Sequence, residues 1–174
     1  MIDSGPIVEA ILRDALDGVD EAVLVERLGE RLRAAGLPIM RIAIACDFLD
    51  PTFDSHGAYW TLGEGGRLEP YARQSTPDAE IAWQRSPWFL LATGQATRVR
   101  RRIDADFRTG EFPIVDEYRG KGATDYLAMI ERVGHLVAIC DMRGLIGSWI
   151  CDAPGCFDDD DVALVAAIMP ALTT

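Results

Sequence analysis

The chain has 174 residues, of which 49% are hydrophobic and 26% charged, and its formal net charge is -11 at pH 7. This length suits one domain with one core, and the composition excludes a disordered chain. The acidic charge disfavours nucleic acid and anionic lipid as partners. No segment approaches the roughly 18 apolar residues of a membrane span, and the N-terminus lacks the basic start of a signal peptide. We therefore expect a cytoplasmic protein that binds neither nucleic acid nor membrane.

Two amphipathic helices are predicted within residues 1–36. The first carries apolar side chains at helical spacing, at Ile7, Val8, Ile11, Leu12 and Leu16. The second is predicted to start after Asp20, which suits an N-cap, and to stop at Gly36. Its apolar face is formed by Leu24, Leu28 and Leu32.

Residues 37–156 are predicted to form a sheet with crossing helices. The apolar run 38–49 is typical of a central strand covered on both faces, and Arg41 is its only charge before Asp47. Residues 50–57 predict a turn-rich loop, and residues 58–74 predict a hairpin around the sequence GEGG.

Three short helices and an edge strand are predicted next. Ser75 or Thr76 suits the cap of the first helix, and Ser86 suits the cap of the second, because a proline follows each cap. The arginine-rich segment 98–102 predicts an exposed strand edge. The third helix ends in the sequence RGKG, at Gly120 or Gly122.

The RGKG sequence raises the question of phosphate binding. Phosphate-binding glycine loops follow a strand and open a helix, whereas these glycines follow a predicted helix and lead into a strand. We therefore interpret them as the end of a helix. Strands are predicted at 124–133, 136–143 and 144–153, and the acidic run 158–161 favours the start of a last helix, within residues 157–174. The order of elements predicts a single α+β domain, residues 1–174, with a central, mostly antiparallel sheet flanked by helices.

No metal site or catalytic group is assigned from the sequence. The cysteines and histidines lack the spacing of a zinc site, the acidic run lacks the pattern of a calcium loop, and no G-x-S-x-G sequence is present. The four cysteines are expected to be thiols in the cytosol. Cys151 and Cys156 flank the sequence DAPG and form a redox pair only if that loop folds back.

A ligand pocket is the sharper functional hypothesis. Short helices over a sheet often roof an apolar pocket with a few polar anchors. The candidate lining residues are Trp60, Trp83, Ser86, Trp88, Phe89, Phe112, Tyr118, Thr124, Asp125 and Tyr126. The alternative is that these aromatic residues simply fill the core, and the sequence leaves both interpretations open.

Several spaced motifs resemble the N-terminal regulatory region of bacterial class III adenylate/guanylate cyclases, a region similar to a GAF domain. The pattern has a W-x-x-SP start, a centre containing GATDY and an ending of the form G-S-W-x-x-D-x-P-G-F. It is carried by Trp83, Ser86, Pro87, Phe112, Pro113, Glu117, Arg119, Gly122, Ala123, Thr124, Asp125, Tyr126, Gly147, Ser148, Trp149, Asp152, Pro154, Gly155, Phe157 and Asp160. Cys156 departs from the pattern as an insertion.

The resemblance implies a GAF-like sensor that binds an unknown small molecule and forms a homodimer. It further implies that residues 157–174 form a signalling helix, and that a catalytic cyclase domain follows in the parent protein. We then expect no enzymatic activity from residues 1–174 alone, and the sequence does not identify a cofactor. Two alternatives stay open: a dimerisation module without ligand, and a redox switch through Cys151 and Cys156.

Overall fold

The computed structural model describes residues 2–47, 53–72, 76–132 and 144–173. Its elements in chain order are α1 (Gly5–Leu16), α2 (Glu21–Ala34), β1 (Ile39–Asp47), β2 (Phe53–Thr61), β3 (Gly65–Ala72), α3 (Pro77–Gln84), α4 (Pro87–Ala92), β4 (Arg98–Arg102), α5 (Pro113–Gly120), β5 (Asp125–Glu131), β6 (Leu145–Cys151), α6 (Asp159–Ile168) and a final 3-10 turn, η1 (Met169–Thr173).

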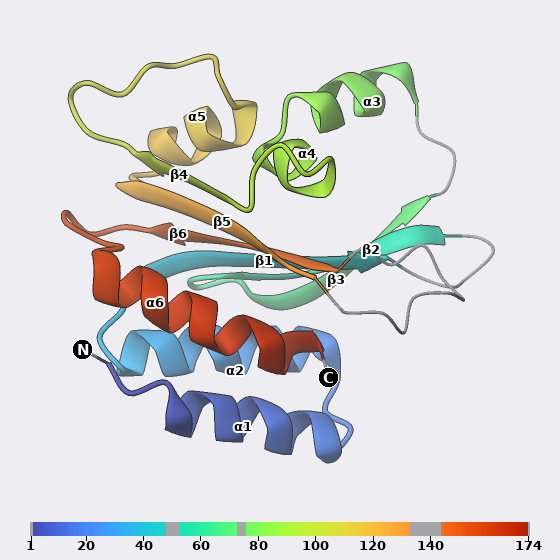
Figure 1. Ribbon diagram of the computed structural model, residues 1–174, viewed down its shortest axis with the longest axis vertical. Helices are drawn as coiled ribbons and strands as arrows, with labels where there is room; N and C mark the ends of the chain where they lie inside the picture. Colours follow the sequence, from blue (N-terminus) through green and yellow to red (C-terminus); the bar gives the residue numbers. More distant parts are fainter. Residues whose placement is uncertain (1, 48–52, 73–75, 133–143, 174) are drawn as a thin grey trace.

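The strands form one sheet in the order β3-β2-β1-β6-β5-β4, and each neighbouring pair is antiparallel. Helices α1, α2 and α6 cover one face of the sheet, and α3, α4 and α5 lie over the other (Figure 1). The apolar strand β1 is central and the arginine-rich strand β4 is at an edge, as predicted. The predicted α+β class, with an antiparallel sheet flanked by helices, is confirmed.

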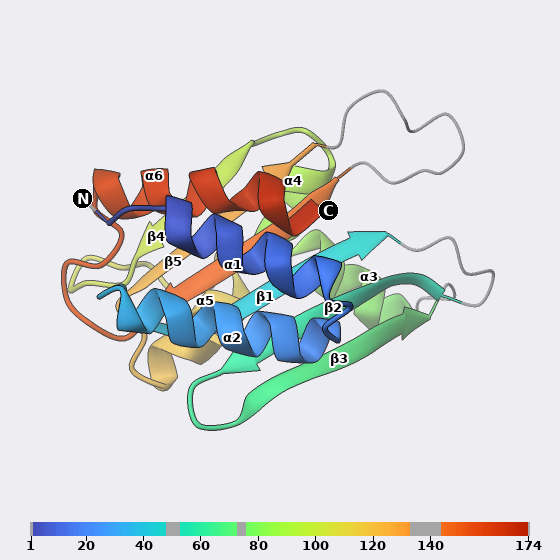
Figure 2. The same ribbon diagram turned by 90° about the horizontal axis from the view of Figure 1, so that it is seen from below.

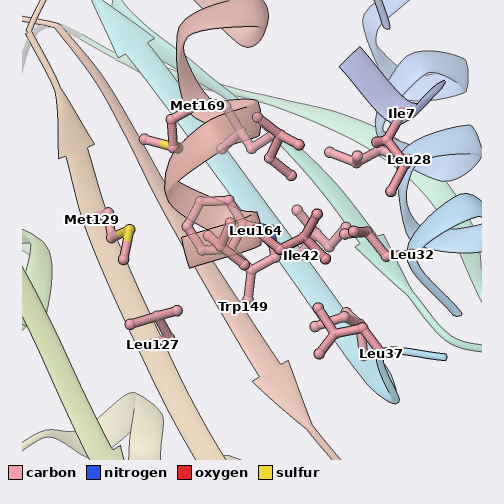
Figure 3. Packing of buried hydrophobic residues seen from close by; sticks show 14 of the residues in the cluster. Ile7, Leu28, Leu32, Leu37, Ile42, Leu127, Met129, Trp149, Leu164 and Met169 are labelled. Atoms are coloured by element: carbon pink, nitrogen blue, oxygen red, sulfur yellow. The ribbon is translucent and has the colours of Figure 1, made fainter. Parts of the chain in front are cut away.

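The larger core lies between the sheet and the layer of α1, α2 and α6, which run side by side across it (Figure 2). Ile42 of β1 and Trp149 of β6 point from the sheet toward Leu28 and Leu32 of α2 and Leu164 of α6 (Figure 3). All five side chains are buried. A second, smaller cluster lies on the opposite face, under α4 and α5.

Helix ends follow the local signals in the sequence. The side chains of Thr76 and Ser86 accept hydrogen bonds from the first turns of α3 and α4, as predicted. Asp158 and Asp161 form a reciprocal capping box at the start of α6. Helix α5 ends at Gly120, and Gly122 has a φ of +93°, a conformation that favours glycine. The RGKG sequence therefore terminates a helix.

The structure corrects one predicted loop. Residues 53–57, predicted as part of a turn-rich loop, belong to β2, because they pair with β1 and β3. The predicted strand 136–143 lies outside the described residues, together with His135 and Cys140. In the segments that the structure describes, no helix is both long enough and apolar enough to span a membrane.

Candidate functional site

The sheet face beneath α4 and α5 has a floor of small residues. Ala43 of β1, Ser148 of β6 and Ala128 of β5 stand in register across three central strands. Each is at most 1% exposed. The bulky residues next to them in sequence, Ile42 and Trp149, are on the other face, because side chains alternate along a strand.

Arg41 reaches this face because β1 contains a bulge. Pairing with β6 shifts between Ile39, which is opposite Cys151, and Arg41, which is opposite Ile150. Met40 is the extra residue, so Ile39 packs in the larger core while Arg41 contacts side chains of the opposite face. A bulge commonly re-aims a side chain in this way beside a functional site.

The Arg41 side chain is buried between two aromatic rings. Its guanidinium carbon lies 5.2 Å from the centre of the Tyr59 ring and 5.0 Å from that of Tyr118. Arg41 is only 7% exposed. Its Nε is buried without a hydrogen-bond partner, and among the described residues no carboxylate forms an ion pair with it. A buried charge without a partner costs several kcal/mol.

Tyr126 lies within electrostatic range of Arg41 and is joined to Ser148 and Trp88. Burial raises the pKa of the Tyr126 phenol well above its ordinary value. Hydrogen bonds from Ser148 and Trp88 and the positive charge of Arg41 oppose that rise. Tyr126 is therefore a neutral hydroxyl at pH 7, within electrostatic range of the guanidinium. This group of Arg41, Tyr59, Tyr118, Tyr126 and Ser148, with Trp88 above it, is called the Arg41 cluster below.

The structure brings several predicted pocket residues to this face. Phe112, Tyr118 and Tyr126 are buried in the smaller cluster, and Trp88 packs against it. Trp83 and Phe89 meet edge to face at 6.0 Å, at the junction of α3 and α4, and Trp83 is 38% exposed.

Four other predicted residues have different surroundings. The hydroxyl of Ser86 caps α4 by accepting from the backbone N–H of Phe89 at 3.1 Å. Trp60 packs in the larger core, on the α2 side of the sheet. The hydroxyl of Thr124 donates to the carbonyl of Ala153 at 2.6 Å. These contacts, with those of Asp125 below, place the ten candidates on both faces of the sheet rather than around one pocket.

Asp125 joins the start of β5 to the segment before α6. Its carboxylate accepts from Nη2 of Arg100 at 2.8 Å, and the same nitrogen donates to the carbonyl of Cys156 at 3.1 Å. Burial raises the pKa of Asp125 above its usual value, and Arg100 opposes the rise. The observed geometry gives Asp125 a bridging role on the larger-core side.

Sequence reasoning missed Arg41, Tyr59 and Ser148 as site residues. Arg41 carried a signal, because it is the one charge in a strand predicted to be covered on both faces. Tyr59 and Trp60 are adjacent in β2, so they face opposite sides of the sheet. Alternation alone does not decide which of the two faces the crossing helices.

Two hollows stand out in the described part of the structure, and neither contains the Arg41 cluster. One, of about 480 Å³, is open to solvent and lined by Glu26, Glu30 and Arg33 of α2, by Trp60 and by the β2–β3 turn. The other, of about 290 Å³, lies beside Thr97, Met129 and Met169. Arg41, Tyr59, Tyr118, Tyr126 and Ser148 are each at most 7% exposed, so the Arg41 cluster is covered by other side chains in this arrangement.

Cys151 and Cys156 form a disulfide, with their Cα atoms 6.2 Å apart. The expectation that they are thiols is wrong for this pair, because the DAPG loop folds back as the redox hypothesis required. Cys151 is the last residue of β6, and Cys156 precedes the cap of α6. Within the described ranges, no group of three or more His, Cys, Asp or Glu side chains is placed to hold a metal ion.

No family model matches the chain, and no curated protein matches it. Among solved structures, it is similar to a phycoerythrobilin-bound GAF domain from a cyanobacterial phytochrome, with a TM-score of 0.56 and 12% identity over 99% of this chain and 93% of that one. It is similar also to a phycocyanobilin-bound GAF domain from a cyanobacterial phytochrome, with a TM-score of 0.53 and 13% identity over the same shares. The predicted GAF-like fold is therefore confirmed: the chain has the fold of a GAF domain.

Proposed function

We propose that this chain is a sensor domain that binds a small molecule on the sheet face beneath α4 and α5. The observation that carries the proposal is the guanidinium of Arg41, whose buried Nε has no hydrogen-bond partner among the described residues, within electrostatic range of the Tyr126 hydroxyl. A layer built only for packing gains nothing from a buried charge, whereas a binding site needs a few fixed polar groups among apolar ones. The GAF fold supports the same interpretation. Bilin binding is a property of the two solved domains.

The layer of α1, α2 and α6 is the proposed output of the sensor. It contains the first and the last helix of the described chain, on the face opposite the Arg41 cluster (Figure 1). In this proposal the domain acts as a cytoplasmic homodimer in a bacterial protein. A ligand that binds one arrangement of the dimer more tightly shifts the population toward it. The helices then act on a downstream adenylate or guanylate cyclase domain, and residues 1–174 have no catalytic activity of their own.

Native mass spectrometry of the purified domain, with an absorption spectrum, tests the sensor proposal. Extra mass or a visible band is expected, and either identifies the class of ligand. A dimer that stays ligand-free after incubation with cell extract contradicts the proposal and favours a dimerisation module without ligand.

A thiol switch is the second candidate function, and the Cys151–Cys156 disulfide favours it. The bonded loop contacts Arg100 of β4 and Thr124, the residue before β5, and it leads directly into α6. Reduction by a dithiol breaks the S–S bond, and the dithiol becomes a disulfide as the two cysteines become thiols. Closing so short a loop stabilises the fold by about 2 kcal/mol. We expect dithiothreitol to lower the free energy of unfolding of the native chain by that amount, with no effect on Cys151→Ser/Cys156→Ser.

A further inference from the structure

The guanidinium of Arg41 has unused hydrogen-bond donors. The rings of Tyr59 and Tyr118 lie against the guanidinium, at 5.2 and 5.0 Å, and stabilise its charge. Ring faces offer no acceptor to the five N–H groups, which point outward in the guanidinium plane. Among the described residues none accepts from Nε, although this atom is buried. The site therefore contains a positively charged guanidinium, positioned by two rings, whose buried Nε–H donor has no acceptor among the described residues.

The neighbouring arginine, Arg67, does not share this condition. Arg67 lies over the same Tyr59 ring, at 5.1 Å, but its Nε donates to a carboxylate oxygen of Glu69 at 2.9 Å. Its side chain is 44% exposed. Arg67 therefore has both an acceptor and water. Arg41 is 7% exposed as a residue, and its Nε is buried and has no acceptor among the described groups.

We infer that the ligand of this domain carries an oxyanion, a carboxylate or a phosphate group, that pairs with the guanidinium of Arg41. The inference rests on the proposed sensor function and adds the chemical class of the ligand. A planar oxyanion accepts two parallel N–H bonds from a guanidinium, which supplies the missing acceptors and the missing negative charge together. A neutral ligand would supply acceptors but would leave the charge uncompensated.

The neighbouring groups fit an oxyanion. Ser148 and Trp88 donate to the hydroxyl oxygen of Tyr126, and the O–H group of Tyr126 is itself a donor. In this region the structure places no described carboxylate in an ion pair with Arg41. Ala43 and Ala128 flank Ser148 across the sheet, so the floor has no bulky side chain at that row. For a small anionic group to reach this floor, the side chains that cover the Arg41 cluster must move.

The test uses sodium phosphate and sodium acetate as probes, with sodium chloride at the same ionic strength as reference. The first measurement is the ¹⁵N–¹H resonance of the Arg41 Nε–H group, identified by its loss in Arg41→Met. The second is the melting temperature, which a bound anion raises by mass action. We expect at least one of the two oxyanions to shift the resonance and to raise the melting temperature above the chloride value.

Two matched variants test whether Arg41 is responsible. Arg41→Met keeps a long side chain between the rings but removes the charge. It should lower the affinity for the oxyanion at least about tenfold, the loss expected when a charged hydrogen-bond partner is removed. Arg67→Met removes the other guanidinium from the same Tyr59 ring and should keep the full response. If Arg41→Met does not fold, Arg41→Lys, which keeps the positive charge but has no Nε–H group, identifies the resonance instead, and its shift in the unaltered protein decides the question.

The outcomes separate this inference from the sensor proposal. A response to acetate alone indicates a carboxylate ligand and a response to phosphate alone a phosphate ester, and both support the inference. An unchanged Nε–H resonance with both probes overturns it, as does a response that survives Arg41→Met. If native mass spectrometry then finds a bound neutral or cationic molecule, the sensor proposal stands without the oxyanion. If it finds none, both fail.

Discussion

Gly29 is the point where α2 comes closest to the sheet. A Cβ atom at this position would lie 2.5 Å from two ring atoms of Trp60, a separation that side chains do not tolerate. Trp60 is only 3% exposed, so its ring has little room to move. The contact explains why a helix interior here contains a residue that costs about 1 kcal/mol in helix propensity.

We expect Gly29→Ala to lower the free energy of unfolding by about 1–3 kcal/mol, because overpacking outweighs the gain in helix propensity. Urea denaturation measures the change. Gly120→Ala is the matched control, since Gly120 is also helical but a Cβ there meets no atom within 4 Å. That variant should be neutral or up to about 1 kcal/mol more stable. Equal effects of the two substitutions would show that the Trp60 contact is not tight.

The difference between local signals and contacts of distant residues explains which site residues could be predicted from the sequence and which could not. Residue type and local spacing located Ser86 as a cap and gathered Tyr118 and Tyr126 as pocket candidates. They could not show that Asp125 pairs with Arg100, 25 residues earlier. Nor could they show the bulge that aims Arg41, because a bulge is visible only in the pairing of β1 with β6. Strand partners and ion-pair partners are set by the three-dimensional fold, so these parts of the site could not be predicted from the sequence.

The N-terminal hairpin of helices is joined by a buried acid. Oδ1 of Asp14 in α1 accepts from Arg27 of α2, and Oδ2 accepts from Arg31, both at 2.6 Å. The Arg31 hydrogen bond lowers the pKa of Asp14, against an opposing effect of burial, and Arg27 adds to the lowering. A carboxyl whose pKa is lower in the folded state stabilises the fold above the unfolded pKa, near 3.9. That stabilisation is lost as the pH falls through the folded-state pKa.

We expect Asp14→Asn to cost about 1–2 kcal/mol at pH 7, since both arginines are partly exposed and screened. The difference from the native chain should be constant down to about pH 5 and should shrink below about pH 4. Urea titrations across this range measure it. The comparison must be between variants, because the raised pKa of Asp125 changes stability with pH in the opposite direction.

Glu9→Gln is the control for the Asp14 prediction. Glu9 pairs with Arg13 along α1, with both side chains about 70% exposed. Such a pair contributes less than about 0.5 kcal/mol. A pH-independent loss in Asp14→Asn would indicate a packing defect instead of a lost ion pair.

Hydrophobic periodicity predicted most elements, because the faces of helices and strands repeat locally. The loop at residues 50–57 was the exception. Gly57 and its polar neighbours have weak strand propensity, yet pairing with β1 on one side and β3 on the other keeps residues 53–57 in β2. Pairing on both sides overrides the local preference of these residues. Local sequence patterns therefore fail to predict a strand whose formation depends on the neighbouring strands.

The assembled domain has apolar side chains exposed at one end of the layer of α1, α2 and α6. Leu16 is 89% exposed, and Leu12 and Val23 are 36% and 40% exposed, all three on α1 and α2. A second copy that paired through α1 and α2 would cover this surface on both chains. The proposed homodimer therefore has a specific candidate interface, which a charge should disrupt.

We expect Leu12→Lys/Leu16→Lys to convert the proposed dimer to a monomer, because association would bury two uncompensated charges from each copy. Sedimentation velocity over a concentration series measures the change. Leu62→Lys/Leu68→Lys is the matched control, since these residues on the β2–β3 hairpin are 46% and 41% exposed and the added charge is the same. That control should stay dimeric. A native chain that sediments as a monomer at every concentration would remove the dimer from the signalling mechanism while leaving ligand binding at Arg41 intact.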